Sequence, residues 1–304
     1  MLHRRPKSAP GAAHGVFVIT TSMAPMHQLV VTLDCPDRPG IVHAITGGIV
    51  AAHGNITELQ QFTSPDTGHF FTRIEVHGAE PDALTAAVAG PAGELGARFR
   101  VDDAARPVRT LILASKAGHV VNDLLFRWRA GDLPIDVVRI MANHDVLAPM
   151  AEFYGVPFTH QGVTADTKPQ FEAEVRRLVE EEGVELVVLA RYMQILSPEL
   201  CEFLAGRAIN IHHSFLPGFK GANPYRQAHT RGVKLIGATA HFVTGDLDEG
   251  PIIEQNVVRV DHTMDVAKLV RKGQAQESQT LAEAVRLVAE HRVLADGDRT
   301  VIFR

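Results

Sequence analysis

Four short apolar runs constrain the fold of this chain more than any other feature of its sequence. They contain little polar alternation and lie at residues 109–114, 135–141, 184–190 and 208–211, with helical spacing between them at residues 120–129, 147–154 and 170–182. Strands that are apolar on both faces are typical of a parallel sheet covered by helices. Ligands of such sheets bind beyond the carboxyl ends of the strands, so polar residues at those ends are the first candidates for a functional site.

The N-terminal part has a different pattern, in which the order is strand, helix, strand, strand, helix, strand. These six predicted elements lie at residues 27–33, 41–54, 55–62, 70–76, 81–97 and 97–101. The order is that of the ferredoxin-like fold. A charged segment at residues 102–107 ends in Pro107 and predicts a linker. We therefore expect one domain over residues 27–105 and a second over residues 106–304, which closes with strands at 235–243 and 251–258 and a helix at 263–292.

Composition argues against several classes of protein. A net charge of -5 with mixed signs disfavours a nucleic-acid-binding protein, which normally carries a basic surface. No apolar run reaches the roughly 18 residues that a membrane-spanning helix needs. Cys35 and Cys201 are too few for a disulfide framework and lack metal-type spacing, so we expect a cytoplasmic protein without a metal. Residues 1–26 predict a disordered tail, and translation from Met23 or Met26 is the alternative.

The turn after the first strand has the sequence of a small-molecule sensor. Asp37, Arg38, Pro39, Gly40 and Ile41 lead from that strand into the first helix, and this stretch resembles the start of an ACT domain. Because glycine has no side chain, the backbone at this turn can approach a ligand closely. The resemblance implies an amino-acid effector, such as glycine or methionine, and a homo-oligomer, because ACT domains usually pair side by side. A tight turn without a ligand is the alternative.

The end of the fourth apolar run carries the strongest chemical signal. Asn210 and His212 are the last polar residues of that strand, and the chain turns at once through Pro217 and Gly218. Residues two apart on a strand point to the same face. An amide donor beside an imidazole suits an oxygen that gains negative charge during a reaction. Ordinary structural hydrogen bonds are the other interpretation.

A second polar stretch lies between the last two predicted strands. Its loop contains Asp246, Asp248 and Glu249, and the strand before the loop contains Thr239 and His241. A plain acidic turn is the simpler interpretation. The polar residues on the preceding strand favour a functional loop.

Together these two stretches resemble the formyltransferase-fold family that uses formyl-tetrahydrofolate. The matching positions are Asn210, His212, Ser214, Pro217, His241 and Asp248. The similarity runs from residue 108 to the C-terminus and implies an α/β, mostly parallel Rossmann-like catalytic domain. It also implies two walls of a folate pocket. One wall consists of Arg191, Tyr192, Met193, Gln194, Ile195 and Leu196, and the other of Thr244, Gly245, Asp246 and Leu247.

The resemblance also assigns roles to the polar residues. Asn210 and His212 would stabilise the formyl oxygen, and Asp248 would orient or activate the attacking group. Whether Asp248 or His212 is the general base stays open. The expected supporting residues are His213, Ser214, Lys220 and His241, with Tyr225 close to them. No cofactor is implied, because the folate is the substrate. Lys116 and His119 are either an anion site at a helix start or surface residues.

Two departures separate this chain from the family members that formylate glycinamide ribonucleotide. Those enzymes hold a phosphate on a Gly-Ser-Gly-like loop, whereas the corresponding segment here, residues 114–125, contains one glycine. His213 also stands where they have proline. With the ACT-like domain, these features resemble the formyltetrahydrofolate deformylase family.

That resemblance implies a hydrolase, which converts 10-formyltetrahydrofolate and water to tetrahydrofolate and formate. It implies that the formate supplies purine biosynthesis and that the reaction balances one-carbon pools. A transferase onto glycinamide ribonucleotide and a non-catalytic folate sensor are the alternatives.

Overall fold

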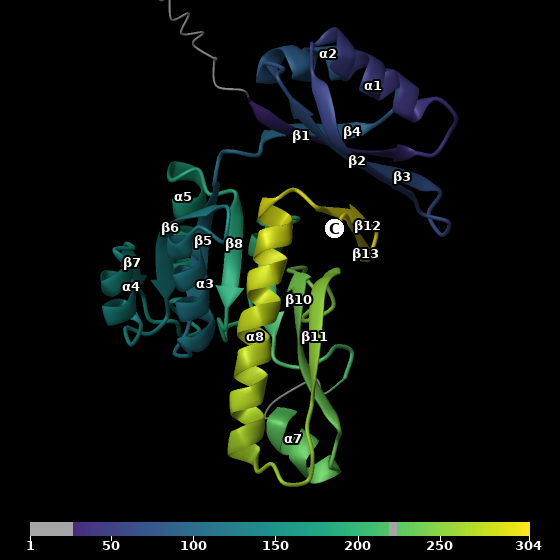
Figure 1. Ribbon diagram of the computed structural model, residues 1–304. Helices are drawn as coiled ribbons and strands as arrows, with labels where there is room; N and C mark the ends of the chain where they lie inside the picture. Colours follow the sequence, from purple (N-terminus) through teal and green to yellow (C-terminus); the bar gives the residue numbers. More distant parts are fainter. Residues whose placement is uncertain (1–26, 219–223) are drawn as a thin grey trace, which may run out of the picture.

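The computed structural model describes residues 27–218 and 224–304, which form two sheets of different kinds. Figure 1 shows an N-terminal sheet covered by α1 and α2, and a larger sheet flanked by the remaining helices. The predicted fold class, a ferredoxin-like domain followed by a mostly parallel Rossmann-like sheet, is confirmed. The predicted tail at residues 1–26 and Lys220 lie outside the described residues.

The N-terminal domain follows the predicted order of elements closely. These are β1 (Gln28–Pro36), α1 (Ile41–Ala51), β2 (Asn55–Thr63), β3 (His69–His77), α2 (Pro81–Leu95) and β4 (Arg98–Asp103). The strands pair antiparallel in the order β2-β3-β1-β4. Apolar side chains of both helices pack on one face of this sheet, among them Ile45 of α1 and Leu84 of α2. The predicted linker is shorter than expected, because β4 extends to Asp103.

The second sheet has seven strands in the order β11-β10-β9-β8-β5-β6-β7. Its strands are β5 (Val108–Ala114), β6 (Ile135–Ala142), β7 (Phe158–His160), β8 (Leu186–Ala190), β9 (Ala208–His212), β10 (Leu235–Phe242) and β11 (Ile252–Arg259). The strands β9, β8, β5, β6 and β7 are parallel to one another, whereas β10 runs antiparallel to β9 and β11 runs antiparallel to β10. The four apolar runs are β5, β6, β8 and β9, and they form the centre of the sheet.

Helices cover both faces of this sheet, as its continuously apolar strands require. The helices are α3 (His119–Ala130), α4 (Ala148–Tyr154), α5 (Lys168–Glu181), α6 (Pro198–Phe203), α7 (Pro224–Arg231) and α8 (Val266–Ala289). Apolar residues of α3, α4 and α8 pack on one face, and those of α5 and α6 on the other. Alternate residues of β5 join the two cores: Ile112 packs in the first and Leu111 in the second. The short elements β7, α6 and α7 were not predicted.

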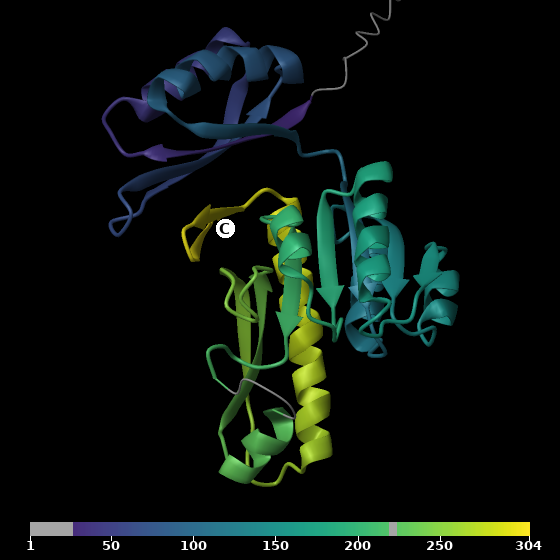
Figure 2. The same ribbon diagram turned by 180° about the vertical axis from the view of Figure 1, so that it is seen from behind.

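A C-terminal hairpin joins the two domains. It consists of β12 (Val293–Asp296) and β13 (Arg299–Ile302), and Figures 1 and 2 show it between the N-terminal sheet and the ends of β10 and β11. Phe71 of β3 packs against Val301 and Phe303, and the Thr67 hydroxyl donates to Asp296 at 2.7 Å. The last residues of the chain therefore cover part of the N-terminal sheet.

Within the described residues, no helix is both long and apolar enough to span a membrane.

Candidate active site

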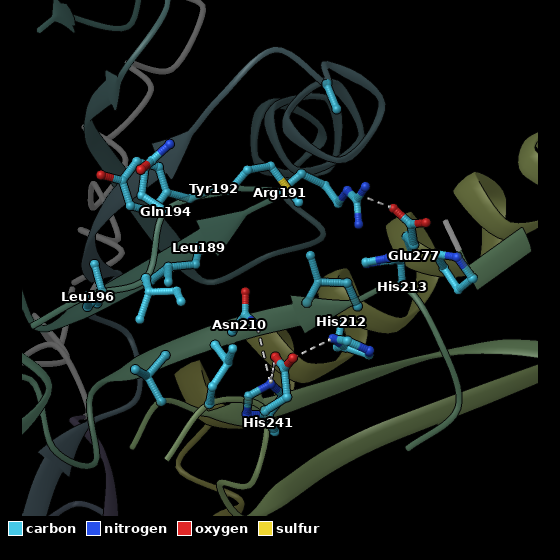
Figure 3. A pocket seen from close by; sticks show the side chains of 18 of the residues that line it. Leu189, Arg191, Tyr192, Gln194, Leu196, Asn210, His212, His213, His241 and Glu277 are labelled. Carbon is cyan, nitrogen blue, oxygen red and sulfur yellow. Dashed lines mark hydrogen bonds and ion pairs between the residues drawn. The ribbon is translucent and has the colours of Figure 1, made fainter. Parts of the chain in front are cut away.

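A cavity of about 730 Å³ opens beyond the carboxyl ends of β8 and β9, where the sequence predicted a ligand. All ten residues of the predicted folate walls line it, together with Asn210, His212, His213, His241 and Asp248. Figure 3 shows Gln194 and Leu196 toward one end of this cavity and Glu277 toward the other, with Asn210 and His212 between them. Of the residues predicted to act there, Ser214 does not line the cavity.

Asn210 and His212 face the cavity because strand residues alternate between faces. The residue between them, Ile211, packs in the core on the opposite face of β9. The register of β9 with β10 places His241 directly opposite Asn210, and the Asn210 Nδ2 atom lies 3.2 Å from Nε2 of His241. The other ring nitrogen of His241 is 2.8 Å from the Phe242 carbonyl oxygen, which only accepts, so that nitrogen carries a proton. In the neutral ring, Nε2 then accepts from Asn210.

Asp248 approaches both histidines from the loop after β10. Its Oδ2 atom is 3.1 Å from Nδ1 of His212, and its Oδ1 atom is 3.7 Å from Nε2 of His241. The His212 ring, followed by the His241 ring, holds the pKa of Asp248 well below its usual range. His212 is 6% exposed, and its Nε2 atom has no hydrogen-bond partner in the described part of the chain. The pair therefore offers the cavity a charged carboxylate and one uncommitted ring nitrogen.

Residues of neighbouring segments hold the wall at residues 191–196 in place. The Ser115 hydroxyl oxygen accepts from the Met193 amide at 3.0 Å, and the Tyr192 ring stacks on Phe171 with centroids 5.4 Å apart. Tyr192 is therefore a buried member of the wall, whereas Met193 and Ile195 keep exposed apolar side chains. Leu247, on the facing loop, is exposed too. Exposed apolar side chains on two walls around a few polar groups suit a small organic ligand.

The predicted supporting residues have different environments. His213 lines the cavity, and burial together with the nearby Arg191 charge lowers its pKa to about 4. Its ring is therefore neutral at physiological pH. Ser214 instead holds the turn, because its hydroxyl donates to the Gly218 carbonyl and its own carbonyl accepts from Thr239.

The predicted effector-binding residues lie at the start of α1, in the N-terminal domain. Gly40 has φ 95°, a left-handed conformation that favours glycine, and the Arg38 guanidinium donates to the Glu94 carbonyl at 2.6 Å. Asp37 and Pro39 are exposed in the same turn, and Ile41 is buried in the core of this domain. None of the five lines the cavity.

The sequence interpretation missed a buried carboxylate in this cavity. Glu277 of α8 is 1% exposed and accepts from Tyr225 at 2.6 Å. His119, for which a surface position was the alternative, is 2.8 Å from the same carboxylate and lines the cavity. No sequence signal distinguishes Glu277 from the other polar residues of a long amphipathic helix.

Comparison with known proteins identifies the family. A model of the formyl transferase family matches residues 108–285, and an ACT domain model matches residues 29–89. The formyltetrahydrofolate deformylase of Corynebacterium sp. (strain P-1) is 47% identical over 279 residues, which are 90% of this chain and 98% of that protein. The chain belongs to the formyltetrahydrofolate deformylase family. The predicted family and the predicted ACT domain are therefore both confirmed.

Solved structures of formyltetrahydrofolate deformylases match both domains. The crystal structure of the deformylase from Burkholderia mallei has a TM-score of 0.89 and 50% identity, and covers 91% of this chain and 100% of its own. By contrast, the structure of glycinamide ribonucleotide transformylase 1 from Symbiobacterium toebii has a TM-score of 0.62 and 34% identity, and covers 66% of this chain. The similarity to deformylases thus extends over a larger share of the chain than that to the transformylase.

Proposed function

We propose that this chain hydrolyses 10-formyltetrahydrofolate to tetrahydrofolate and formate. Its membership of the formyltetrahydrofolate deformylase family supports the reaction. The observation that carries the proposal is the pairing of His212 with Asp248 beside Asn210, in a cavity large enough for a drug-sized ligand. In the reaction, the water oxygen adds to the formyl carbon, the bond from that carbon to N10 breaks, and N10 gains the proton that water loses.

Asn210 and His212 stabilise the formyl oxygen as it gains negative charge. The Asn210 amide nitrogen has two hydrogens, and since the contact with His241 uses one, the second is available to the substrate. His212 holds Asp248 through Nδ1, so a protonated ring has Nε2–H left as a donor. Preorganised donors of this kind are each worth a factor of about 10² to 10³ in rate.

Asp248 orients the attacking water and relays its proton. The lowered pKa of Asp248 keeps the carboxylate charged at neutral pH, so that it accepts hydrogen bonds from water and from Nδ1 of His212. As the bond to N10 breaks, the proton that leaves the water passes through this pair to the nitrogen. The relay contributes the rate enhancement of about 10² to 10⁴ that is typical of positioned acid–base groups.

The segment after β5 favours water over a phosphorylated acceptor. Its single glycine, Gly118, is explained by packing, because a Cβ there would lie 3.0 Å from Cε of Met150 and 3.2 Å from Cδ2 of Leu147. A phosphate cradle usually needs several glycines, which let backbone amides approach the oxygens. Formyl transfer to glycinamide ribonucleotide is therefore the less supported alternative. A sensor that only binds folate would not need the paired Asp248 and His212.

We also propose that the N-terminal domain binds an amino-acid effector, such as glycine or methionine, at the turn that contains Gly40. The match to the ACT domain supports an effector of this class. Side-by-side pairing of two N-terminal domains in a homo-oligomer is part of the same proposal. Calorimetric titration of the full chain with each amino acid tests it, with Gly40→Val as the variant that crowds the turn. Equal binding to both proteins, or to neither, would contradict the proposed site.

The reaction itself is tested by formate release from 10-formyltetrahydrofolate, with and without glycinamide ribonucleotide. We expect formate and tetrahydrofolate in equal amounts without the acceptor. Turnover only with the acceptor would establish the transferase instead, and folate binding without any turnover would establish the sensor. By family membership, we further propose that the formate supplies purine biosynthesis and that the reaction balances one-carbon pools.

A further inference from the structure

One buried charged group in the cavity has no part in the proposed reaction. Glu277 accepts from the Tyr225 hydroxyl at 2.6 Å, its Oε2 atom lies 2.8 Å from Nε2 of His119, and the same oxygen is 3.4 Å from Nε of Arg191. Figure 3 shows the Glu277 carboxylate directed toward Arg191. These four residues are called the Glu277 cluster below.

The Glu277 cluster brings together four separate segments of the chain. His119 begins α3, Arg191 follows β8 with φ 60°, Tyr225 belongs to α7, and Glu277 belongs to α8. One turn before Glu277, a Cβ at Gly273 would lie 2.0 Å from the Tyr225 hydroxyl oxygen. The absence of a side chain at position 273 thus lets the Tyr225 ring lie directly on α8. The ring is therefore held against α8, with its hydroxyl on Glu277.

The Glu277 carboxylate is charged and fully engaged with its neighbours. Burial alone would raise its pKa, but the His119 bond and the Arg191 charge hold that pKa below its ordinary value. Moving Tyr225 or His119 away would leave a buried charge short of partners, which is energetically unfavourable. The side chains around Glu277 therefore resist displacement by an incoming ligand.

The Glu277 cluster lies next to the reacting groups. The His213 ring is 4.9 Å from the His212 ring and 6.4 Å from the Tyr225 ring, measured between centroids. In Figure 3, Glu277 lies at the opposite end of the cavity from Gln194 and Leu196, where the folate is proposed to bind. A second organic substrate would have to reach the formyl carbon from the end that Glu277 occupies.

We propose that the Glu277 cluster excludes any nucleophile larger than water from the formyl carbon, and so determines that the formyl group is hydrolysed rather than transferred. The inference rests on the proposed function and names the residues that select water over other acceptors. Tyr225 and His119 line the end of the cavity from which an amine acceptor would approach, and Glu277 holds both in place. Water is small enough to enter beside His213.

The test measures how the formyl group divides between water and glycinamide, a small amine. In transfer, the amine nitrogen attacks the formyl carbon, the bond to N10 breaks, and a proton from the amine goes to N10. Tyr225→Ala removes the ring, whereas Tyr225→Phe keeps its volume. We expect formylglycinamide, detected by mass spectrometry, to increase at least about tenfold in Tyr225→Ala relative to the wild type, and not in Tyr225→Phe.

A folded Tyr225→Ala protein that hydrolyses the substrate without forming formylglycinamide would overturn the proposal. So would transfer by the wild type at the level of Tyr225→Ala. Loss of all turnover in a folded variant would also overturn it, because the Glu277 cluster would then act in the reaction itself. If Tyr225→Ala does not fold, His119→Ala opens the other side of Glu277 and is subject to the same outcomes. Failure of the proposed function can be told apart from failure of this inference, because the wild type would then release no formate in water.

Discussion

Nδ1 of His212 lies 3.1 Å from Oδ2 of Asp248, although the two residues come from different segments of the sheet. His212 ends the parallel part of the sheet on β9, whereas Asp248 follows the antiparallel strand β10. Because β10 runs antiparallel to β9, the loop after Phe242 begins beside Ile209 and folds back so that Asp248 reaches His212. The predictions below begin with this pair and then extend to the rest of the molecule.

Asp248→Asn removes the charge and keeps the shape of the side chain. We expect kcat to fall by about 10³, because both the relay and the charged partner of His212 are lost. The KM for the folate should stay within about threefold, since the folate walls are untouched. Steady-state formate release measures both constants. Asp261→Asn, at an exposed position, is the matched control, and a kcat within about tenfold of the wild type in Asp248→Asn would contradict the assigned role.

Asn210→Ala removes the amide donor beside the formyl oxygen. The expected loss in kcat is about 10² to 10³, the usual cost of deleting one donor to a developing oxyanion. Single-turnover kinetics should show the loss in the chemical step, with substrate binding nearly unchanged. An effect confined to substrate binding would mean that Asn210 holds the folate rather than the transition state.

His213 makes the protein sensitive to moderate acid. Its pKa of about 4 in the folded state lies below the ordinary 6.5, so the unfolded state binds more protons between these values. Stability is therefore complete above about pH 7 and decreases as pH falls toward about 4, by at most about 3 kcal/mol from this group. Urea unfolding across this range should show a weaker pH dependence in His213→Asn than in the wild type. The exposed His43→Asn is the control, and identical pH slopes in all three proteins would refute the prediction.

Arg73 links the N-terminal sheet to the end of α8. Its side chain is 3% exposed, pairs with Glu58 at 2.9 Å and Glu75 at 2.8 Å, and donates to the Glu290 carbonyl. Arg73→Ala leaves Glu58 and Glu75 with the more distant Arg292, at 3.5 and 3.8 Å, as their cationic partner, so we expect the free energy of unfolding to fall by about 2–3 kcal/mol.

Urea denaturation measures this change. The matched variant is Arg98→Ala in the same domain, which removes an ion pair whose arginine is 79% exposed and should cost less than about 1 kcal/mol. Equal losses in the two variants would show that the contacts to α8 contribute nothing.

Gly40→Ala places a side chain at a left-handed position. We expect the free energy of unfolding to decrease by about 1–2 kcal/mol, because φ 95° is strained for alanine although the site has open space. Gly47→Ala, within α1 and equally free of close neighbours, should instead increase stability by about 0.5–1 kcal/mol. Thermal unfolding of both variants measures the contrast, and changes of the same sign would contradict it.

The sheet and the paired residues were predictable because they depend on local periodicity. Continuous apolar runs indicated β5, β6, β8 and β9, and the two-residue repeat of a strand placed Asn210 and His212 on one face. The turn at Gly40 was also marked, since few other residues adopt its backbone conformation.

The Glu277 cluster and the C-terminal hairpin could not be predicted in this way. Glu277 lies on a helix rich in polar residues, where a carboxylate normally faces solvent, and its burial depends on Tyr225 and His119 from distant segments. The strands β12 and β13 have four residues each and bury little by themselves. Their position depends on Phe71 of β3, which no local pattern reveals.

The central claim is that water attacks the formyl carbon in the absence of any other acceptor. Turnover of 10-formyltetrahydrofolate in ¹⁸O-labelled water, followed by mass spectrometry of the product, tests it most directly. The account predicts formate that carries one labelled oxygen per molecule, formed in equal amount with tetrahydrofolate and lost in Asp248→Asn. Unlabelled formate, or no formate until an amine acceptor is added, would contradict it.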